Sequence, residues 1–220
     1  MKKQEASAWV REGLTVLAEL GPEGLTIDEL CRRLHLTKGS FYHHYANRSV
    51  YISAVLAFWE QEMTAHVIEV SEQEGTAQQR LRRLTQISTT FEHERVETII
   101  RAWASQDETV RLYQERVDRK RLQYLSELCG TILENPDDGL ALAQIFYTMY
   151  VGAQHIFPPV GGKDLQQLYG YFQQHFQRQE KGRVSPLREE AGTEVRDRSQ
   201  PEKQQSSYLN EEENRCHNSM

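Results

Sequence analysis

Apolar residues recur at intervals of three and four along most of the chain, and this spacing most constrains how the chain can fold. Such intervals place apolar side chains on one face of an α-helix. Alternating apolar and polar runs bounded by turn signals, which would predict strands, are missing. Only six prolines interrupt the 220 residues. The sequence therefore predicts an all-α protein.

The N-terminal helices are marked by clear start and stop signals. A first helix is predicted over residues 6–20, where Gly21 and the following proline stop it. A second helix begins at Thr26, and Glu29 three residues later predicts a capping box. In that motif the threonine side chain accepts from the amide of Glu29, whose carboxylate reaches back to the cap.

A third short helix is predicted from Thr37 to about Tyr45, and Asn47 then caps a fourth. The second and third helices are separated only by His35 and Leu36. Two short helices joined by such a turn and preceded by a third helix form a helix-turn-helix pattern.

The third helix has one inner and one outer face. If Phe41 points to the core, Tyr45 lies about 40° away on the same face, whereas Tyr42 and His43 lie about 100–200° away. The groups that this helix offers to a partner are those of Thr37, Lys38, Gly39, Ser40, Tyr42 and His43. Amides, hydroxyls and a cation suit phosphate, and a glycine permits close approach to the major groove.

Thr26 and Arg48 begin the neighbouring helices, where they can hold backbone phosphates on either side. The alternative is that Lys38, His43 and Arg48 form an ordinary solvated face. Several independent features favour the DNA-binding interpretation.

Residues 25–48 of this chain resemble the DNA-binding signature of the TetR family of bacterial transcription regulators. The likeness is strongest over Thr37-Lys38-Gly39-Ser40-Phe41-Tyr42-His43-His44-Tyr45. The likeness is close over residues 8–60, and the remainder is similar only in architecture. One departure is His35, which replaces the small glycine usual in the turn. His35 must adopt a left-handed conformation or reshape the turn.

The resemblance implies roles for individual residues. Thr26, Tyr42 and Arg48 match positions that hold phosphates, and Thr37 matches the cap of the recognition helix. The positions that lie against bases or the adjacent backbone are matched by Lys38, Gly39, Ser40 and His43.

The resemblance also implies partners: a double-stranded DNA operator, a small-molecule effector and a second copy of the chain. The family dimerises through its last two long helices, here about 137–156 and 163–179. A twofold-symmetric dimer implies a palindromic operator. We expect a transcriptional regulator, most simply a repressor that an effector releases, although activation stays open.

We divide the chain into three segments. Residues 1–48 form the helix-turn-helix domain with a net charge of +1, and residues 49–180 form the effector-binding and dimerisation domain with a net charge of −6. Residues 181–220 carry few large apolar groups and are predicted to be a disordered tail. The total charge of −6 excludes an indiscriminate nucleic-acid binder, but not a small DNA-reading module.

The larger domain is expected to consist of long helices. These are predicted at about 48–71, 76–92, 94–104, 107–133, 137–156 and 163–179. Candidate effector-pocket residues are Trp59, His66, His93, Trp103 and Tyr113. The alternative is that these aromatic residues, at helical spacing, belong to the core.

Other classes of function find little support. Cys31, Cys129 and Cys216 form no metal-binding spacing, and we expect no metal, no cofactor and a cytoplasmic location. The N-terminus has no apolar signal segment, and no stretch reaches the roughly 18 apolar residues of a membrane span. The run at 161–164 lacks the first glycine and the Ser/Thr of a phosphate loop, so we expect no enzyme. An all-helical interaction protein is the remaining alternative.

Overall fold

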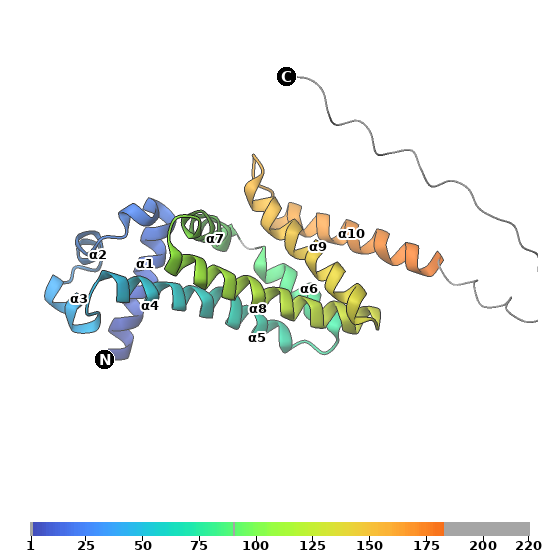
Figure 1. Cartoon of the computed structure of the whole chain (residues 1–220), viewed down its shortest axis with the longest axis horizontal. Coiled ribbons are helices and arrows are strands. Elements are labelled where there is room, and N and C mark those ends of the chain that lie inside the picture. Colours follow the sequence, from blue (N-terminus) through green and yellow to red (C-terminus); the bar gives the residue numbers. More distant parts are fainter. Residues whose placement is uncertain (1, 90, 183–220) are drawn as a thin grey trace, which may run out of the picture. The chain divides into compact units, whose positions relative to one another are not determined.

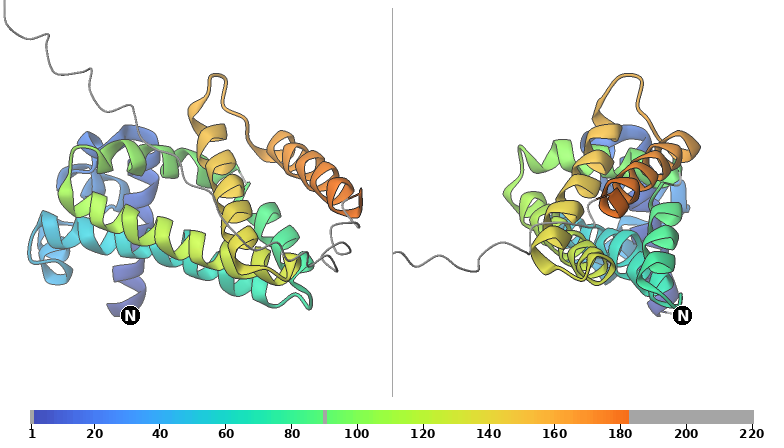
Figure 2. Two further views of the ribbon diagram at one scale, coloured as in Figure 1. Left: turned by 45° about the vertical axis from the view of Figure 1, so that its right-hand side comes forward. Right: turned by 90° about the vertical axis from the view of Figure 1, so that its right-hand side faces the viewer.

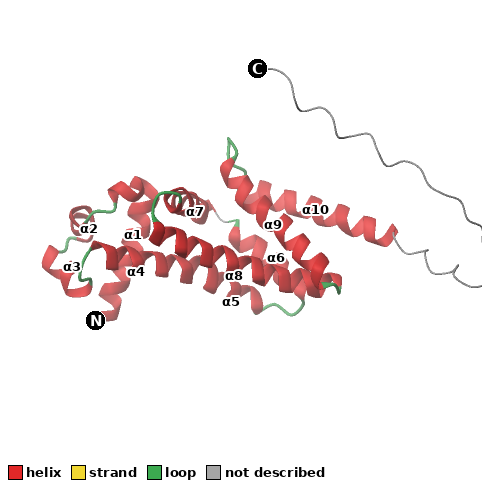
Figure 3. Ribbon diagram, in the orientation of Figure 1, coloured by secondary structure: helices red, strands yellow, loops and turns green. Residues whose placement is uncertain are grey.

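The computed structural model describes the backbone of residues 2–89 and 91–182, and the side chains of residues 6–89 and 95–172. Every regular element in this part of the chain is a helix (Figure 3), which confirms the all-α prediction. The helices are α1 (Lys2–Gly24), α2 (Ile27–Leu34), α3 (Lys38–His44), α4 (Arg48–Glu60), η1 (Gln61–Ala65), α5 (His66–Glu72), α6 (Ala77–Ser88), α7 (Phe91–Ala104), α8 (Glu108–Leu133), α9 (Pro136–His155) and α10 (Gly162–Gly182). The predicted disordered tail lies, beyond Gly182, outside the described residues. Among the helices that are described, none has the length and apolar character needed to cross a membrane.

The break in α1 lies where the sequence predicts a stop. Gly21 has φ 70° and ψ −173°, so the regular helix ends at Leu20 and a short turn follows through Pro22. Glycine takes this left-handed φ at no steric cost, and proline cannot continue the hydrogen-bond ladder. The start differs from the prediction, since α1 begins at Lys2 rather than residue 6.

Only half of the predicted capping box of α2 forms. The Thr26 hydroxyl accepts from the amide of Glu29 at 3.2 Å, as predicted. The Glu29 carboxylate does not reach back; it accepts from the guanidinium groups of Arg32 and Arg33 instead. Two full positive charges one turn along the helix outcompete the neutral amide of Thr26, which bonds to the carbonyl of Gly24 at 2.8 Å.

The caps of α3 and α4 are as predicted. The Thr37 hydroxyl accepts from the amide of Ser40 at 3.2 Å, and the Asn47 side chain accepts from the amide of Val50 at 3.0 Å. Each cap is worth about 1 kcal/mol of helix stability. The two caps thus fix the residues at which α3 and α4 begin.

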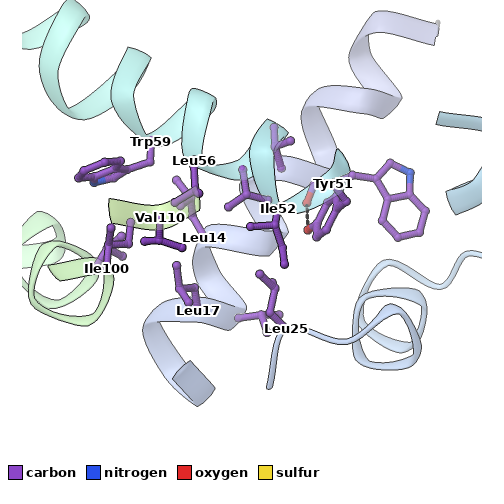
Figure 4. Packing of buried hydrophobic residues seen from close by; sticks show 14 of the residues in the cluster. Leu14, Leu17, Leu25, Tyr51, Ile52, Leu56, Trp59, Ile100 and Val110 are labelled. Atoms are coloured by element: carbon purple, nitrogen blue, oxygen red, sulfur yellow. Dashed lines mark hydrogen bonds between the residues drawn. The ribbon is translucent and has the colours of Figure 1, made fainter. Parts of the chain in front are cut away.

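The N-terminal helices share one hydrophobic core with α4, α7 and α8 (Figure 4). Phe41 of α3 is fully buried and packs edge-on against Trp9 of α1 and Tyr51 of α4, with ring centroids 5.4 and 5.2 Å apart. The Tyr51 hydroxyl donates to the backbone carbonyl of Trp9 at 2.9 Å. Burial of an aromatic ring such as Phe41 stabilises the fold by about 1.5–3 kcal/mol. The position of α3 is therefore tied to both its neighbours.

The predicted fourth helix is one continuous path interrupted by a π-helical turn. It runs through α4, η1 and α5, and α4 lies alongside α8 (Figure 1). Within η1 the amide of His66 donates to the carbonyl of Gln61, five residues back. Such turns insert one residue into a helix and occur frequently at functional sites.

A second hydrophobic core lies among α6, α8, α9 and α10. Figure 2 shows α9 leading to the connecting loop and α10 returning from it. Tyr169 of α10 is buried, and its hydroxyl donates to the carbonyl of Phe146 in α9 at 3.2 Å.

Candidate nucleic-acid interface and internal cavity

The turn between α2 and α3 accommodates His35 in the left-handed conformation. His35 has φ 54° and ψ 37°, and its amide donates to the carbonyl of Cys31. The amide of Leu36 donates to the same carbonyl at 3.0 Å. The first of the two predicted outcomes for this position, a left-handed residue in an otherwise regular turn, is therefore the one observed.

Helix α3 separates its apolar and polar side chains as its spacing predicts. Phe41 and Tyr45 are buried, and the Tyr45 hydroxyl donates to the carbonyl of Ala6 at 3.1 Å. Tyr42, which is 54% exposed, and His43, which is also exposed, lie on the side of α3 away from these two buried residues. The outer face of α3 thus presents a phenol and an imidazole on a helix whose inner face is fixed.

The first turn of α3 is open to its surroundings. Thr37, Lys38 and Gly39 are exposed, and Ser40 is half-buried. A Cβ added at Gly39 would meet only the Thr37 hydroxyl, at 3.6 Å. Packing within the chain therefore does not require a glycine here, which leaves close approach of an external partner as a reason for it.

Lys38 is paired across the turn with a residue of α2. Its Nζ lies 2.6 Å from Oδ1 of Asp28, and both side chains are well exposed. The hydrogen bond that Lys38 donates to the Asp28 carboxylate raises the pKa of Lys38, which is thus a fixed positive charge. A phosphate that approaches Lys38 competes with this carboxylate.

Thr26 and Arg48 lie at the starts of α2 and α4, the helices before and after α3 in the chain. Thr26 is exposed and its hydroxyl caps α2. Arg48 donates through Nε to the carbonyl of Leu25 at 3.1 Å and through Nη2 to that of Pro22 at 3.4 Å. Arg48 therefore ties the start of α4 to the turn before α2. The eight residues predicted to bind DNA all lie at the start of α2, on α3 with its cap, or at the start of α4.

A cavity of about 60 Å³ lies among η1 and the helices α5 to α10. Its aromatic wall is formed by Tyr124, Phe146, Tyr147, Tyr150 and Tyr169. Its aliphatic wall is formed by Met63, Val67, Ile68, Leu84 and Leu125. Its polar groups are those of Thr64, Thr85, Ser88, Glu97 and Arg121. A mostly apolar hollow with a few polar groups is typical of small-molecule sites.

The charged groups on the cavity wall form a buried ion pair. Arg121 of α8 donates through Nη1 to Oε2 of Glu97 at 2.8 Å and through Nη2 to Oε1 at 2.6 Å. The Glu97 side chain is 1% exposed and that of Arg121 is 11% exposed. Burial alone would lower the pKa of Arg121, but the adjacent Glu97 carboxylate outweighs it and raises this pKa well above its usual value. Arg121 therefore keeps its positive charge, which the adjoining Glu97 carboxylate balances.

The same guanidinium also holds the π-helical turn. Arg121 donates through Nε to the hydroxyl of Thr64 at 2.9 Å and through Nη2 to the backbone carbonyl of Met63 at 3.0 Å. Met63 and Thr64 both belong to η1 and both line the cavity. The ion pair on the cavity wall is thus hydrogen-bonded to the π-helical turn η1.

A second ion pair supports the aromatic wall. Arg101 and Asp118 are joined by two hydrogen bonds of 2.9 Å, and the Tyr147 hydroxyl donates to Oδ1 of Asp118 at 2.7 Å. Burial raises the pKa of Tyr147 to about 12, so its hydroxyl keeps its proton at neutral pH. The orientation of this ring is therefore set by Asp118.

Of the five predicted effector-pocket residues, the four whose side chains are described do not line this cavity. Trp59 is fully buried one layer behind it, where Nε1 donates to Oε1 of Glu97 at 3.1 Å. His66 has a side chain 57% exposed, 3.6 Å from Glu69. The side chain of His93 lies outside the described residues.

The other two candidates pack at the surface of the first core. Trp103 and Tyr113 are half-buried against it, and the guanidinium of Arg116 lies 4.3 Å from the centre of the Tyr113 ring. Trp59, Trp103 and Tyr113 therefore lie where the alternative interpretation predicts, as aromatic residues at helical spacing that pack in or against the core.

Glu97 and Arg121 are not among the residues predicted from the sequence, although a signal for them is present. Arg121 lies four residues after the buried Val117 and three before Tyr124, so helical spacing places it on the inner face of α8. Glu97 likewise lies three residues before Ile100 on the buried side of α7. Two opposite charges on inner faces of neighbouring helices predict a buried pair. Across the residues that the structure describes, no group of three or more His, Cys, Asp or Glu side chains could hold a metal ion.

Comparisons with known proteins agree with this architecture. Residues 10–50 match the family model of bacterial regulatory proteins of the tetR family. No curated protein sequence matches the chain at a significant level.

Solved structures of bacterial regulators share the fold at low sequence identity. One is a TetR-family transcriptional regulator from Agrobacterium tumefaciens, with 16% identity and a TM-score of 0.58 over 70% of this chain and 87% of that one. Another, described as a transcriptional regulator from Saccharomonospora viridis in complex with choline, has 12% identity and a TM-score of 0.68 over 79% and 97%. The reduced form of NemR from E. coli has 20% identity and a TM-score of 0.55 over 68% and 85%.

Proposed function

We propose that this chain, a member of the TetR family of bacterial transcriptional regulators, is a repressor that binds a palindromic operator as a homodimer and is released by a small-molecule effector. The observation that carries the DNA-binding part is the outer face of α3, where Lys38, Gly39, Tyr42 and His43 are exposed on a helix with a fixed inner face. Residues 1–48 act as the DNA-reading domain in this proposal. Residues 49–180 bind the effector and the second subunit.

In this proposal the eight residues have distinct roles. Lys38, Gly39, Ser40 and His43 lie against bases or the adjacent backbone, while Thr26 and Tyr42 bind phosphate and Thr37 holds the start of α3. Arg48 contributes in two ways, because two of its nitrogens are bonded to carbonyls of the chain. Its Nη1 has no partner among the described residues and is the nitrogen that we assign to a phosphate.

The dimer is supported by apolar side chains left exposed on α9 and α10. These are Leu140, Ile145, Leu168 and Tyr171, between 42% and 65% exposed. Exposed apolar side chains on these two helices are available to a subunit interface, where contact with a partner removes them from water. We assign these two helices to the four-helix interface of the homodimer.

The effector response is supported by the route from the cavity to α3. The connecting helix α4 is capped by Asn47, three residues after the last residue of α3, and the π-helical turn that follows α4 lines the cavity. Arg121 fixes that turn through Met63 and Thr64. An effector that displaces these contacts shifts α4 and with it the spacing of the two recognition helices. A coupling of about 1–3 kcal/mol changes operator occupancy about 5- to 150-fold. A structurally similar regulator solved with choline is consistent with a small-molecule site in this fold.

Selection of bound DNA from a random pool tests the function directly. We expect a palindromic sequence to be enriched by the full chain. Lys38→Ala should weaken binding to that sequence and lower the dependence of affinity on salt by about one counterion, and Tyr42→Ala should cost about 1–3 kcal/mol.

The matched control for Lys38 is Lys120→Ala, since Lys120 is an exposed lysine of α8. Circular dichroism and sedimentation check that the variants keep the fold and the dimer. Failure to enrich any sequence, or wild-type affinity of both Lys38→Ala and Tyr42→Ala, would refute DNA recognition through α3.

A further inference from the structure

We propose that the cavity binds a small uncharged aromatic molecule that carries a hydroxyl group, of about the size of phenol; this rests on the proposed function, which makes the cavity the effector site. Three properties of the wall lead to this ligand class. They are its internal charge balance, its aromatic rings and the way its hydroxyl groups are already bonded.

The charge balance disfavours an ionic ligand. Glu97 and Arg121 are the charged groups among the residues that line the cavity, and their two-pronged pairing neutralises both. An anion that approaches Arg121 also approaches the Glu97 carboxylate, and a cation near Glu97 meets the guanidinium. An ion would therefore lose its hydration without gaining a net opposite charge. An uncharged ligand avoids this cost.

The wall offers aromatic rings against which one flat ring of a ligand can pack. Phe146 and Tyr169 lie with ring centroids 5.4 Å apart, and Tyr147 stacks on Tyr150 at 6.1 Å. Aromatic pairs in such geometries gain about 0.5–1.5 kcal/mol beyond the area they bury. The cavity of about 60 Å³ is smaller than the roughly 150 Å³ of an engineered cavity that holds benzene. A single ring therefore fits only if a flexible wall residue moves, and Met63 in η1 is such a residue.

The polar groups on the wall are suited to a hydroxyl. The hydroxyl of Tyr147 donates to Asp118, that of Tyr169 to a backbone carbonyl, and that of Ser88 to the carbonyl of Leu84 at 2.8 Å. Their remaining capacity is as acceptors. Arg121 uses four of its five N–H groups, which leaves one hydrogen on Nη1 without a partner among the described residues. A ligand hydroxyl that donates to one of these wall oxygens and accepts from Nη1 of Arg121 satisfies both the free acceptor and the free donor.

Binding of four probes of similar size to the full chain, without DNA, tests the ligand class. Isothermal titration at pH 7 with phenol, benzoate, benzylamine and cyclohexanol separates charge from ring character. We expect phenol to bind at least about tenfold more tightly than benzoate and benzylamine, a difference of about 1.4 kcal/mol. Cyclohexanol should bind about two- to tenfold more weakly than phenol, because it lacks the aromatic ring.

Two pairs of variants locate the binding site. Ser88→Leu fills the cavity from α6 and should abolish phenol binding, whereas Ser126→Leu places the same side chain at a half-buried serine of α8 that does not line it. Glu97→Gln leaves Arg121 unbalanced and should strengthen benzoate binding about tenfold. Glu60→Gln removes the partner of Arg116 away from the cavity and should not.

The inference is overturned if benzoate, benzylamine or cyclohexanol binds as tightly as phenol, or if phenol does not bind up to its solubility limit. It is also overturned if Ser88→Leu binds phenol like the wild type. The serine pair decides the question even if Glu97→Gln fails to fold. Operator release is measured separately: phenol that binds without releasing DNA leaves the ligand class standing and refutes the effector part of the proposed function.

Discussion

Nζ of Lys38 lies 2.6 Å from Oδ1 of Asp28, so the lysine that opens α3 is held by a carboxylate of the preceding helix. The bond spans the helix-turn-helix motif and keeps the lysine side chain in one orientation. It also places a negative charge on the surface that we assign to DNA. Operator binding must therefore break or share this pair, and Asp28 sets how much Lys38 contributes.

Removal of that carboxylate should tighten operator binding. An exposed ion pair is worth about 0.2–1 kcal/mol, so Asp28→Asn is expected to raise affinity by up to about fivefold at low salt, and less at high salt. Fluorescence anisotropy with the selected operator measures the change. Glu74→Gln removes the same charge from the loop before α6 and should leave affinity unchanged. Equal or weaker binding by Asp28→Asn would show that the pair orients Lys38 rather than restraining it.

The turn residue offers a test of stability. A residue other than glycine in the left-handed region costs about 1–2 kcal/mol, and His35 has φ 54°. We expect His35→Gly to raise the free energy of unfolding by up to about 1 kcal/mol, the glycine's greater entropy in the unfolded chain offsetting part of the gain. Urea denaturation measures this change in the free energy of unfolding. His43→Gly, within α3, should instead destabilise by about 0.5–1 kcal/mol. Destabilisation by His35→Gly would mean that the imidazole makes an important contact of its own.

The fold was predictable where local signals are strong. Thr37 and Asn47 cap α3 and α4 as their positions predict, because the side-chain-to-amide bond depends on nearby residues alone. The π-helical turn at Gln61–Ala65 was not predicted, and a continuous helix over residues 48–71 was expected instead. Its stabilising contacts come from Arg121, 57 residues beyond Thr64, and no local pattern specifies such a partner.

The outer face of α3 and the cavity likewise differ in how far the sequence alone predicts them. The outer face of α3 follows from the burial of one residue, Phe41, because helical periodicity then determines which side chains face outward. The cavity depends on how six separate helices and η1 pack together. Trp59 was a candidate because it is aromatic, and it lies one layer behind the wall. Glu97 was overlooked because a carboxylate is rarely buried unless it is paired, and its partner Arg121 lies on another helix.

Acid should destabilise α2 through one carboxylate. Hydrogen bonds from Arg32 and then Arg33 lower the pKa of Glu29 from 4.5 to about 2. Because the pKa is lower in the folded state, Glu29 contributes its full stability above about pH 4.5 and loses it as the pH falls toward 2. The melting temperature of Glu29→Gln should therefore lie below that of the wild type at neutral pH.

The difference between the two proteins should shrink steadily between pH 4.5 and 2, as measured by circular dichroism. Glu74→Gln is the control, since Glu74 forms no ion pair within the described residues. A difference that stays constant through this range would mean that the arginine pairs do not stabilise the folded state.

The link between α8 and η1 can be tested without an effector. Arg121→Lys keeps a positive charge opposite Glu97 but cannot also reach the Met63 carbonyl and the Thr64 hydroxyl. Loss of a hydrogen bond to a charged group costs about 1.5–3 kcal/mol, so amides of residues 63–67 should exchange with solvent at least about tenfold faster.

Arg116→Lys is the matched control, since Arg116 joins α8 to Glu60 of α4 away from the cavity. Hydrogen exchange followed by mass spectrometry gives the rates segment by segment. Unchanged exchange over residues 63–67 in Arg121→Lys would refute the role of Arg121 in fixing the turn.

Dimerisation should depend on the exposed apolar side chains of α10. Leu168 is 47% exposed, and a charge there would be buried without a partner in the proposed interface. An unpaired buried charge costs about 2–5 kcal/mol, so Leu168→Glu should raise the dimer dissociation constant at least about thirtyfold in sedimentation equilibrium. Leu112→Glu introduces the same charge at an equally exposed leucine of α8 and should leave the dimer intact. If Leu112→Glu dissociates the subunits and Leu168→Glu does not, the interface lies on α8 rather than on the last two helices. Because each operator half-site binds one α3, a monomeric Leu168→Glu that keeps its fold should also lose most of its affinity for the palindrome.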